Sequence, residues 1–229
     1  MQMLTMPAET TTTRKSVLVV DDHPLLRQGL ALLINQQHDM QVCGEVEDAH
    51  GALQFIAQNL PDIMILDISL KGPDGIELLK SIRALYPDLP VLVLSMHDEA
   101  IYAERALRAR ANGYIMKQEA TEKVLVALRR ILGGDVYLSD NMSKKMLHQY
   151  IDGASSIIQS RIAALSDREL EVFRSIGEGR GTREIAEELH LSVKTVETYQ
   201  AHIKEKLSLR SGRELIQHAI QWKISEKAN

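Results

Sequence analysis

The chain of 229 residues is 45% hydrophobic and 25% charged, a composition that is typical of an ordinary globular protein and excludes wholesale disorder. Its length favours two domains, and no apolar stretch reaches the roughly 18–20 residues that cross a bilayer. The net charge is −4 overall, but residues 1–160 hold 15 basic against 20 acidic residues and residues 161–229 hold 12 against 11. Because the start lacks the apolar core of a signal peptide and Cys43 is the single cysteine, we expect a cytoplasmic protein without an internal disulfide or a membrane span.

A regular alternation fills residues 15–134, after a polar, threonine-rich stretch at 1–14 that we expect to be a disordered tail. Short β-branched apolar runs alternate there with segments of helical apolar spacing. Runs that are apolar on both faces and separated by helices are typical of a parallel sheet covered on both sides. The pattern therefore predicts an α/β doubly wound (βα)5 domain with a five-stranded parallel sheet. The predicted strands are 16–20, 41–46, 63–66, 91–95 and 113–116, and the predicted helices are 25–34, 51–58, 76–85, 102–109 and 124–132.

Only helical periodicity remains in residues 161–229, after a polar stretch at 135–160 that indicates a linker with one short helix around 144–150. Ser166 and Glu169 have the spacing of a capping box and predict a helix that runs to about residue 177. Further helices are predicted at 182–189, 193–207 and 211–222. Two of them are joined by the three-residue turn 190–192. We expect an all-α four-helix domain that contains a helix-turn-helix.

Side chains suited to phosphoryl chemistry follow the ends of four predicted strands. Asp21 and Asp22 follow the first strand, Asp67 the third, Ser95 ends the fourth, and Lys117 follows the fifth. The carboxyl ends of parallel strands share one edge, where ligands bind, so these five residues should converge. Three carboxylates repel one another, and a cation held by oxygen ligands, most simply Mg²⁺, would relieve that repulsion. Asp67 could then attack a phosphoryl group whose charge Lys117 neutralises and to which Ser95 donates a hydrogen bond.

Each of these residues alone has a simpler explanation, because aspartates after strands often form turns or cap helices. Their joint occurrence at four strand ends favours the site. His23 is expected to pack at the start of the first helix, since Mg²⁺ prefers oxygen ligands, and Cys43 is expected in the core.

The segments VLVVDDHPLLRQGL, MILDISLKGPDGIELL, VLVLSMHDE and GYIMK resemble the signatures of a response-regulator receiver domain over about residues 15–134. In that family a partner sensor histidine kinase phosphorylates the aspartate after the third strand. The resemblance implies that Asp67 is the phosphoacceptor, that Asp21, Asp22, Asp67 and the backbone carbonyl of Ser69 hold Mg²⁺, and that Ser95 and Tyr114 form a switch pair.

Two positions depart from the receiver pattern. Lys71 stands where the family usually has proline, and Arg110 stands where a glycine is common. Neither residue belongs to the acceptor chemistry, although Lys71 can alter the neighbouring loop.

The predicted helix 193–207 has two distinct faces. Positions 193, 196, 200, 203 and 207 form a stripe with four apolar members, which should pack on the domain. The opposite face could read DNA, because it offers small or hydrogen-bonding groups for base edges and donors for phosphates. An ordinary amphipathic helix with a solvated face is the alternative. The residues of this face are Lys194, Glu197, Thr198, Ala201 and His202, flanked by Thr195, Tyr199 and Lys206.

The strings LSDRELEVFRSIGEG and TREIAEELHLSVKTVETYQAHIKEKL resemble the DNA-binding domain of NarL/LuxR-type (FixJ-type) regulators. The resemblance implies that Lys194, Glu197, Thr198 and Ala201 lie nearest the major groove, with Thr195, Tyr199, His202 and Lys206 closer to the DNA backbone. Glu197 stands at a groove-facing position where many relatives have a basic or amide residue, and Ala201 cannot donate a hydrogen bond. With few cations on this face, we expect weak binding by one domain and a homodimer on a two-half-site operator, with residues 211–222 as the candidate dimer contact.

The sequence thus predicts a transcription regulator of a two-component system, with a sensor histidine kinase, double-stranded operator DNA and a second copy of itself as partners. One alternative is a phosphatase that forms an aspartyl-phosphate. It is disfavoured because Ser69 stands where a second acid would be needed and because no cap insertion is present. The other alternative is a DNA-binding protein with a vestigial receiver, which the complete set of acidic, hydroxyl and lysine residues disfavours.

Overall fold

The computed structural model describes residues 14–70, 75–96, 99–144, 146, 162, 164–189 and 191–227. The chain forms two compact units, Met1–Ser143 and Lys144–Asn229. Most of the predicted tail lies outside the described residues, as do residues 145 and 147–160 of the predicted linker and Lys71. The domain boundaries of the sequence analysis therefore stay a prediction.

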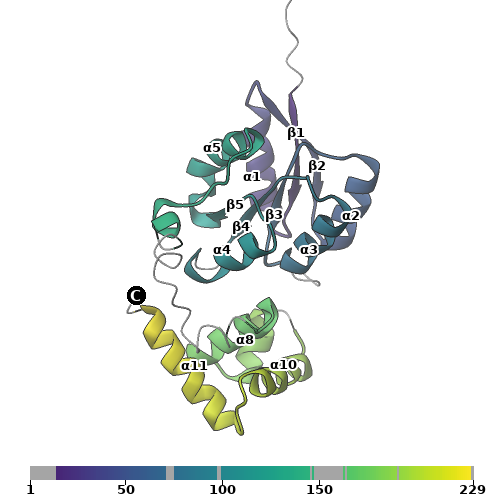
Figure 1. Ribbon diagram of the computed structural model, residues 1–229. Helices are drawn as coiled ribbons and strands as arrows, with labels where there is room; N and C mark the ends of the chain where they lie inside the picture. Colours follow the sequence, from purple (N-terminus) through teal and green to yellow (C-terminus); the bar gives the residue numbers. More distant parts are fainter. Residues whose placement is uncertain are drawn as a thin grey trace, which may run out of the picture. The chain divides into compact units, whose positions relative to one another are not determined.

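The first unit is built on a five-stranded parallel sheet with the strand order β2-β1-β3-β4-β5 (Figure 1). This sheet confirms the predicted (βα)5 fold. β3 and β4 are buried along their whole length, because helices cover both faces of the sheet. The strands are β1 (Lys15–Val20), β2 (Met40–Val46), β3 (Ile63–Asp67), β4 (Val91–Ser95) and β5 (Gly113–Met116).

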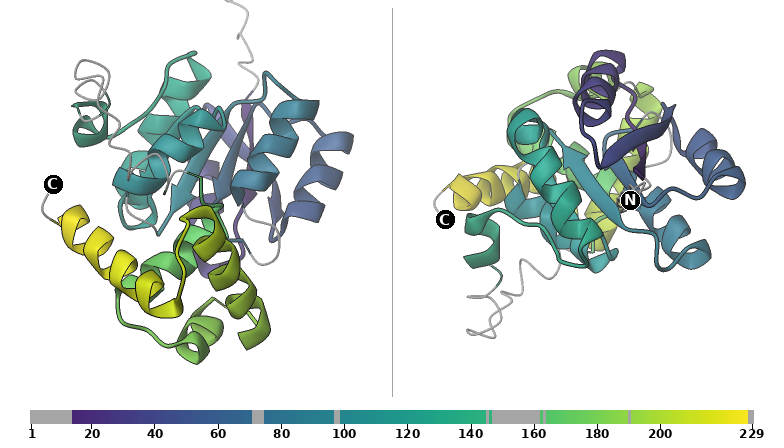
Figure 2. Two further views of the ribbon diagram at one scale, coloured as in Figure 1. Left: turned by 60° about the horizontal axis from the view of Figure 1, so that its bottom comes forward. Right: turned by 90° about the horizontal axis from the view of Figure 1, so that it is seen from above.

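Helices cover both faces of the sheet, one set on each face (Figures 1 and 2). On the first face, Ile65 and Leu94 of the sheet pack with Ile34 of α1 and Leu128 of α5 in one core cluster. Burying such side chains is the main source of stability, at about 1.5–3 kcal/mol for each one fully buried. The pair on this face is α1 (Pro24–Asn35) and α5 (Ala120–Leu132); the opposite face carries α2 (Ala49–Gln58), α3 (Gly75–Leu85) and α4 (Glu99–Arg108), and a single turn, η1 (Lys117–Glu119), precedes α5.

The strand order places β1 between β2 and β3, so the chain changes direction across the sheet at β1. Such a switch point opens a crevice beyond the carboxyl ends of the two strands, where ligands bind. It also leaves β2 at the edge, with every second residue facing solvent. Cys43 is therefore exposed, and the expectation that it lies in the core is wrong.

The backbone conformation of Arg110 explains why a glycine is common at this position. Its φ of 67° lies in the left-handed region, which costs residues with a Cβ roughly 1–2 kcal/mol. The Arg110 carbonyl accepts a 2.8 Å hydrogen bond from Nε of Arg83, which holds the turn in this conformation.

The residues after α5 remain in contact with the first unit. Tyr137 forms a parallel bridge with Gly113 of β5, and residues 140–144 are helical. The predicted helix at 144–150 begins earlier than expected, and residues 147–150 lie outside the described part of the chain.

The second unit is all-helical in its described residues, as predicted. Ser166 caps α8, and the Glu169 side chain accepts from the Ser166 N–H in return, which confirms the predicted capping box. Val196 and Ile203 of α10 are buried, whereas Val193, which was expected in the same stripe, is 40% exposed. The helices are α8 (Asp167–Gly177), α9 (Thr182–Glu188), α10 (Val193–Lys206) and α11 (Gly212–Lys227), the last being longer than predicted.

Among the described residues, none of the helices combines the length and the apolarity that a membrane crossing requires.

Gly75 provides a test of how closely the start of α3 approaches β3. A Cβ at this position would lie 2.3 Å from the carbonyl oxygen of Asp67 and 2.7 Å from Cα of Ile68, and neither backbone atom can move cheaply. We expect Gly75→Ala to destabilise the first unit by about 1–3 kcal/mol. Native-state amide exchange of the β3 residues in the full chain measures this loss.

The matched control is Gly29→Ala, in the exposed middle of α1, where no atom lies within 4 Å of the added methyl group. This change should stabilise the same amides by about 0.5–1 kcal/mol, because alanine is the better helix former. Equal effects of the two substitutions would contradict the close approach at Gly75.

Candidate functional site

An acidic pocket lies at the carboxyl end of the sheet. Asp21 and Asp22 follow β1, Asp67 is the last residue of β3, and Lys117 follows β5. The strand order brings the ends of β1 and β3 together, as the sequence analysis expected. Asp67 is fully buried, Asp21 and Lys117 are nearly so, and the pocket is therefore formed by charged groups with little access to water.

The Lys117 ammonium links two of the carboxylates. Its Nζ donates a 2.7 Å hydrogen bond to Oδ2 of Asp67 and lies 2.8 Å from Oδ2 of Asp21. The other oxygen of Asp67, Oδ1, accepts from the backbone N–H of Ser69 at 3.0 Å. These contacts fix the orientation of the Asp67 carboxylate.

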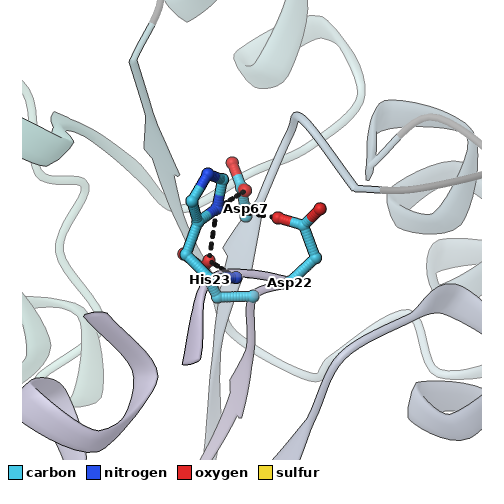
Figure 3. A group of neighbouring side chains, drawn as sticks. Asp22, His23 and Asp67 are labelled. Carbon is cyan, nitrogen blue, oxygen red and sulfur yellow. Dashed lines mark hydrogen bonds and ion pairs between the residues drawn. The ribbon is translucent and has the colours of Figure 1, made fainter. Parts of the chain in front are cut away.

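His23 belongs to this cluster, which the sequence analysis did not expect. Its Nδ1 lies 2.7 Å from Oδ1 of Asp22, 3.1 Å from Oδ1 of Asp21 and 3.9 Å from Oδ2 of Asp67 (Figure 3). Nδ1 is also 3.4 Å from Nζ of Lys117. The ring precedes α1, as expected, but it turns toward the carboxylates rather than only packing at the helix start. Its position next to two aspartates in the sequence was the one available signal.

The residues of the pocket fit a divalent cation. One ligand atom from each of Asp21, Asp22, His23 and Asp67 lies within 4.8 Å of the others. Two buried oxygens, Oδ2 of Asp21 and Oδ1 of Asp22, accept no hydrogen bond of good geometry. Each has only an ion-pair neighbour, Lys117 for Asp21 and His23 for Asp22. One lysine cannot neutralise three carboxylates, and a set dominated by carboxylate oxygens suits Mg²⁺.

Burial raises the pKa of Asp67 above its usual range, and the charge of Asp21 acts in the same direction. The ammonium of Lys117 and the hydrogen bond from Ser69 oppose this rise by stabilising the carboxylate. A bound cation would act in the same sense as Lys117.

Ser95 lies on the strand next to that of Asp67, and Tyr114 lies one strand further across the sheet. Ser95 ends β4, the neighbour of β3, and is fully buried. Tyr114 lies on β5, opposite Val93 of β4, and is 1% exposed, so its ring is inside the first unit. Both predicted switch residues are thus buried in the first unit, on the two strands that follow β3 in the sheet.

The exposed face of α10 carries the residues that the sequence analysis expected there. Six of them are exposed, and Thr195 and Tyr199 are half-buried at the flanks. Thr195 forms a 2.7 Å hydroxyl contact with Ser192, the N-cap of α10, and the Thr198 hydroxyl donates to the Lys194 carbonyl at 2.9 Å. The exposed residues are Lys194, Glu197, Thr198, Ala201, His202 and Lys206.

Lys206 is engaged with a buried carboxylate. Its Nζ donates a 2.6 Å hydrogen bond to Oε2 of Glu169, and Nδ1 of His202 lies 3.7 Å from Oε1 of the same residue. Burial alone would raise the pKa of Glu169, but the hydrogen bonds from Lys206 and Ser166 outweigh it and lower that pKa. Glu169 therefore pairs with Lys206 and lies near His202, two residues of α10 that the sequence analysis assigned to the DNA backbone.

Residues 17–129 match the response regulator receiver domain, and residues 163–219 match the luxR family of bacterial regulatory proteins. The oxygen regulatory protein NreC of Staphylococcus carnosus is 35% identical over 212 residues, covering 91% of this chain and 98% of that protein. NreC of Staphylococcus epidermidis is 33% identical over 215 residues, covering 92% and 99%.

Solved structures are similar as well. RcsB from Salmonella enterica serovar Typhimurium, bound to the promoter rprA in the presence of the phosphomimetic BeF3−, is 26% identical with a TM-score of 0.58 over 90% of this chain and 98% of that one. A two-component response regulator of the LuxR family from Aurantimonas is 29% identical with a TM-score of 0.57, over 61% of this chain and 99% of that one.

A receiver domain followed by a LuxR-type helix-turn-helix makes a two-component response regulator that binds DNA and regulates transcription. The chain belongs to the LuxR family of response regulators. The predicted family is thus confirmed, and the phosphatase alternative is set aside because the matched families are regulators rather than enzymes. Receiver domains bind Mg²⁺ in an acidic pocket, and the first unit has an acidic cluster of this kind.

Glu169→Gln tests the ion pair that joins α8 to α10. The folded state lowers the pKa of Glu169, so its carboxylate stabilises the fold above the ordinary pKa of 4.5, and the contribution is lost as the pH falls through the lowered value. We expect the variant to lose about 1–3 kcal/mol of unfolding free energy near pH 7, and the difference from wild type to shrink below pH 4.5.

Urea unfolding followed by tryptophan fluorescence measures this loss, because Trp222 is the only tryptophan and its ring centroid lies 5.6 Å from that of Phe173 of α8. The control is Glu205→Gln, at an exposed position of α10. A loss that persists unchanged at acid pH would show that packing, rather than charge, is responsible.

Proposed function

We propose that this regulator is controlled by phosphorylation of Asp67 and that phosphorylation promotes dimerisation and operator binding through α10. The observation that carries the proposal is the buried Asp67 carboxylate, held by Lys117 and adjacent to two further carboxylates at neighbouring strand ends. The family match gives the pocket a use, since receiver domains accept phosphoryl groups from a kinase.

The proposed reaction moves a phosphoryl group from a phosphohistidine of a sensor kinase to Asp67. A carboxylate oxygen of Asp67 bonds to phosphorus and the P–N bond breaks. Its electron pair stays on the ring nitrogen, and the ring leaves as neutral imidazole with a proton taken from solvent. Lys117 neutralises part of the charge on the transferring oxygens, and the Ser69 N–H keeps the carboxylate oriented.

Mg²⁺ would be held by Asp21, Asp22, Asp67 and the carbonyl of Ser69, and it would neutralise the phosphoryl oxygens on the side away from the lysine. The carboxylates of Asp21 and Asp22 lie in place for this role. His23 is close enough to both of them to limit how far their side chains can turn.

The proposed switch uses Ser95 and Tyr114. The Ser95 hydroxyl would donate to the new phosphoryl group, and the Tyr114 ring would fill the space behind it, which shifts a two-state equilibrium at α4 and β5. The burial of both residues, on the adjacent strands β4 and β5, supports this assignment.

DNA contact is proposed for the exposed face of α10. Lys194, Glu197, Thr198 and Ala201 would lie nearest the major groove, and Thr195, Tyr199, His202 and Lys206 nearer the phosphates. The DNA-bound structures of RcsB, at 26% identity over 90% of this chain, support DNA as the ligand. Because Lys206 is paired with Glu169, we propose that its contribution to DNA binding is smaller than that of Lys194.

A second copy of the chain is the proposed partner of α11. Ile216, Ile220 and Ile224 are spaced by four residues and are 50%, 40% and 64% exposed, so they form an apolar stripe on one side of the helix. Ile220 and Ile224 also line a hollow with Gly177 of α8. RcsB has been solved as dimers on DNA, which supports a homodimer as the DNA-bound form here.

Because its operator DNA lies in the cytoplasm, we propose the cytoplasm as the compartment of this regulator.

Asp67→Asn tests the proposed phosphoacceptor. With acetyl phosphate and Mg²⁺, wild type should become phosphorylated, sediment as a dimer and bind a duplex selected from a random-sequence pool about 5- to 150-fold more tightly. The variant should show none of these changes, because an amide cannot accept the phosphoryl group. Phosphate-affinity electrophoresis, sedimentation and fluorescence anisotropy measure the three responses.

Asp88→Asn, at an exposed turn position before β4, is the control and should behave like wild type. A variant at position 67 that still gains DNA affinity would refute the proposal. If phosphorylated wild type dimerises without any gain in DNA affinity, the proposed effect on dimerisation stands and the proposed effect on operator binding is refuted.

Lys194→Ala tests the orientation of α10 in the groove. If Lys194 contacts base edges, the variant should lose about 1–3 kcal/mol of affinity for the selected duplex and discriminate less at one base pair. Repeating the selection with the variant measures that change. Lys80→Ala, an exposed lysine of α3, is the charge-matched control. An equal loss on all sequences, with a salt slope reduced by about 1, would instead assign Lys194 to a phosphate.

A further inference from the structure

The chain returns to the sheet after α5. We call residues 135–143 the return segment. The N–H of Tyr137 donates to the carbonyl of Asn112 at 2.9 Å, and the N–H of Tyr114 donates to the carbonyl of Tyr137 at 3.1 Å. Tyr137 is therefore hydrogen-bonded in both directions to the β5 side of the sheet, and one of its partners is the backbone of the proposed switch tyrosine.

Gly113 permits this close approach. A Cβ at position 113 would lie 2.9 Å from the carbonyl oxygen of Tyr137 and 2.9 Å from Cδ1 of Ile131. The carbonyl cannot move away without loss of the hydrogen bond from Tyr114. The side chain of Tyr137 contacts α5, because the centroid of its ring lies 5.9 Å from the guanidinium carbon of Arg130. The return segment is thus held between β5 and α5.

Ser139 continues the attachment to α4. Its hydroxyl donates a 2.5 Å hydrogen bond to Oε2 of Glu99, and its N–H donates to Oε1 of the same carboxylate at 3.2 Å. Glu99 is the first residue of α4. The Ser139 hydroxyl also accepts from the N–H of Met142 at 3.1 Å, so the same side chain begins the helix at 140–144.

These contacts connect the proposed switch to the chain that leads to the DNA-binding domain. A movement of Tyr114 acts on the carbonyl of Tyr137, and a movement of α4 acts on Ser139 two residues later. Hydrogen bonds to a carboxylate are among the stronger ones in proteins, so the segment has to follow α4 or lose them. Coupling between distant sites is carried by such chains of hydrogen bonds between elements with two arrangements.

We propose that Ser139 and Glu99 are coupling residues: their paired hydrogen bonds transmit the phosphorylation-dependent rearrangement of α4 and β5 to the segment that leads into the DNA-binding domain. This inference rests on the proposed function, because it requires that modification of Asp67 changes α4 and β5. It assigns the return segment a signalling role beyond that of a spacer.

Two variants break the pair from its two sides. Glu99→Gln weakens both hydrogen bonds and leaves the cap on residues 140–144 intact, whereas Ser139→Ala removes the hydroxyl and with it the cap. Ser139→Thr keeps the hydroxyl and should restore wild-type behaviour. Glu104→Gln, which breaks the exposed pair with Arg108 on the same helix, and Ser143→Ala, four residues further along the segment, are the matched controls.

The experiment uses the full chain with Mg²⁺ and beryllofluoride as a phosphoryl analogue. Fluorine NMR measures occupancy at Asp67, and anisotropy measures the gain in affinity for the duplex selected by wild type. In Glu99→Gln and Ser139→Ala we expect unchanged occupancy and a gain reduced by about two- to thirtyfold, the range that mutations along coupling paths produce. The controls and Ser139→Thr should keep the wild-type gain.

The outcomes separate this inference from the proposed function. A wild type that binds beryllofluoride without any gain in DNA affinity contradicts the proposed function and this inference with it. A normal wild-type gain that both coupling variants retain overturns this inference alone. A purely structural role would lower the thermal stability of the first unit in these variants while leaving the gain unchanged, and it would count against the proposal as well.

Discussion

The repulsion among three clustered carboxylates, two of them buried, is the constraint on which the first unit depends. Parallel strands end at one edge, and the order β2-β1-β3-β4-β5 makes Asp21, Asp22 and Asp67 neighbours there. Lys117 offsets part of their charge through two short contacts, and the remainder favours a bound cation. The same excess charge that makes the pocket costly to fold would, under the proposed function, favour Mg²⁺ and, with the metal, a phosphoryl group. Stability and chemistry are thus set by one group of residues.

The second unit balances the same two demands through Glu169. This buried carboxylate completes the capping box of α8 and binds Lys206 of α10. It therefore links α10, the helix with the proposed DNA contacts, to α8. The pairing lowers the positive charge that α10 can offer to phosphates. A nearly neutral DNA-binding half and a dependence on dimerisation are therefore expected to accompany each other in this chain.

The sequence predicted the strands and most helices within a few residues, because apolar periodicity and buried runs are local signals. It also placed Asp21, Asp22, Asp67 and Lys117 at one edge by a topological rule. It did not predict which strand lies at the edge, and for that reason Cys43 was misplaced in the core. The turn of His23 toward the aspartates and the pairs Lys206–Glu169 and Ser139–Glu99 were also missed. Each of these depends on side-chain directions or on contacts between residues far apart in the sequence, which periodicity does not encode.

The order of the pocket residues along the chain has a consequence for synthesis on the ribosome. Asp21, Asp22 and Asp67 emerge first, but the pocket is incomplete until β5 has left the exit tunnel and joined the sheet with Lys117 behind it. Domains fold as units, with the N-terminal one first during translation. The acidic pocket can therefore close and take up its cation while α10 is still untranslated, so a nascent chain has a finished input domain before it has any output.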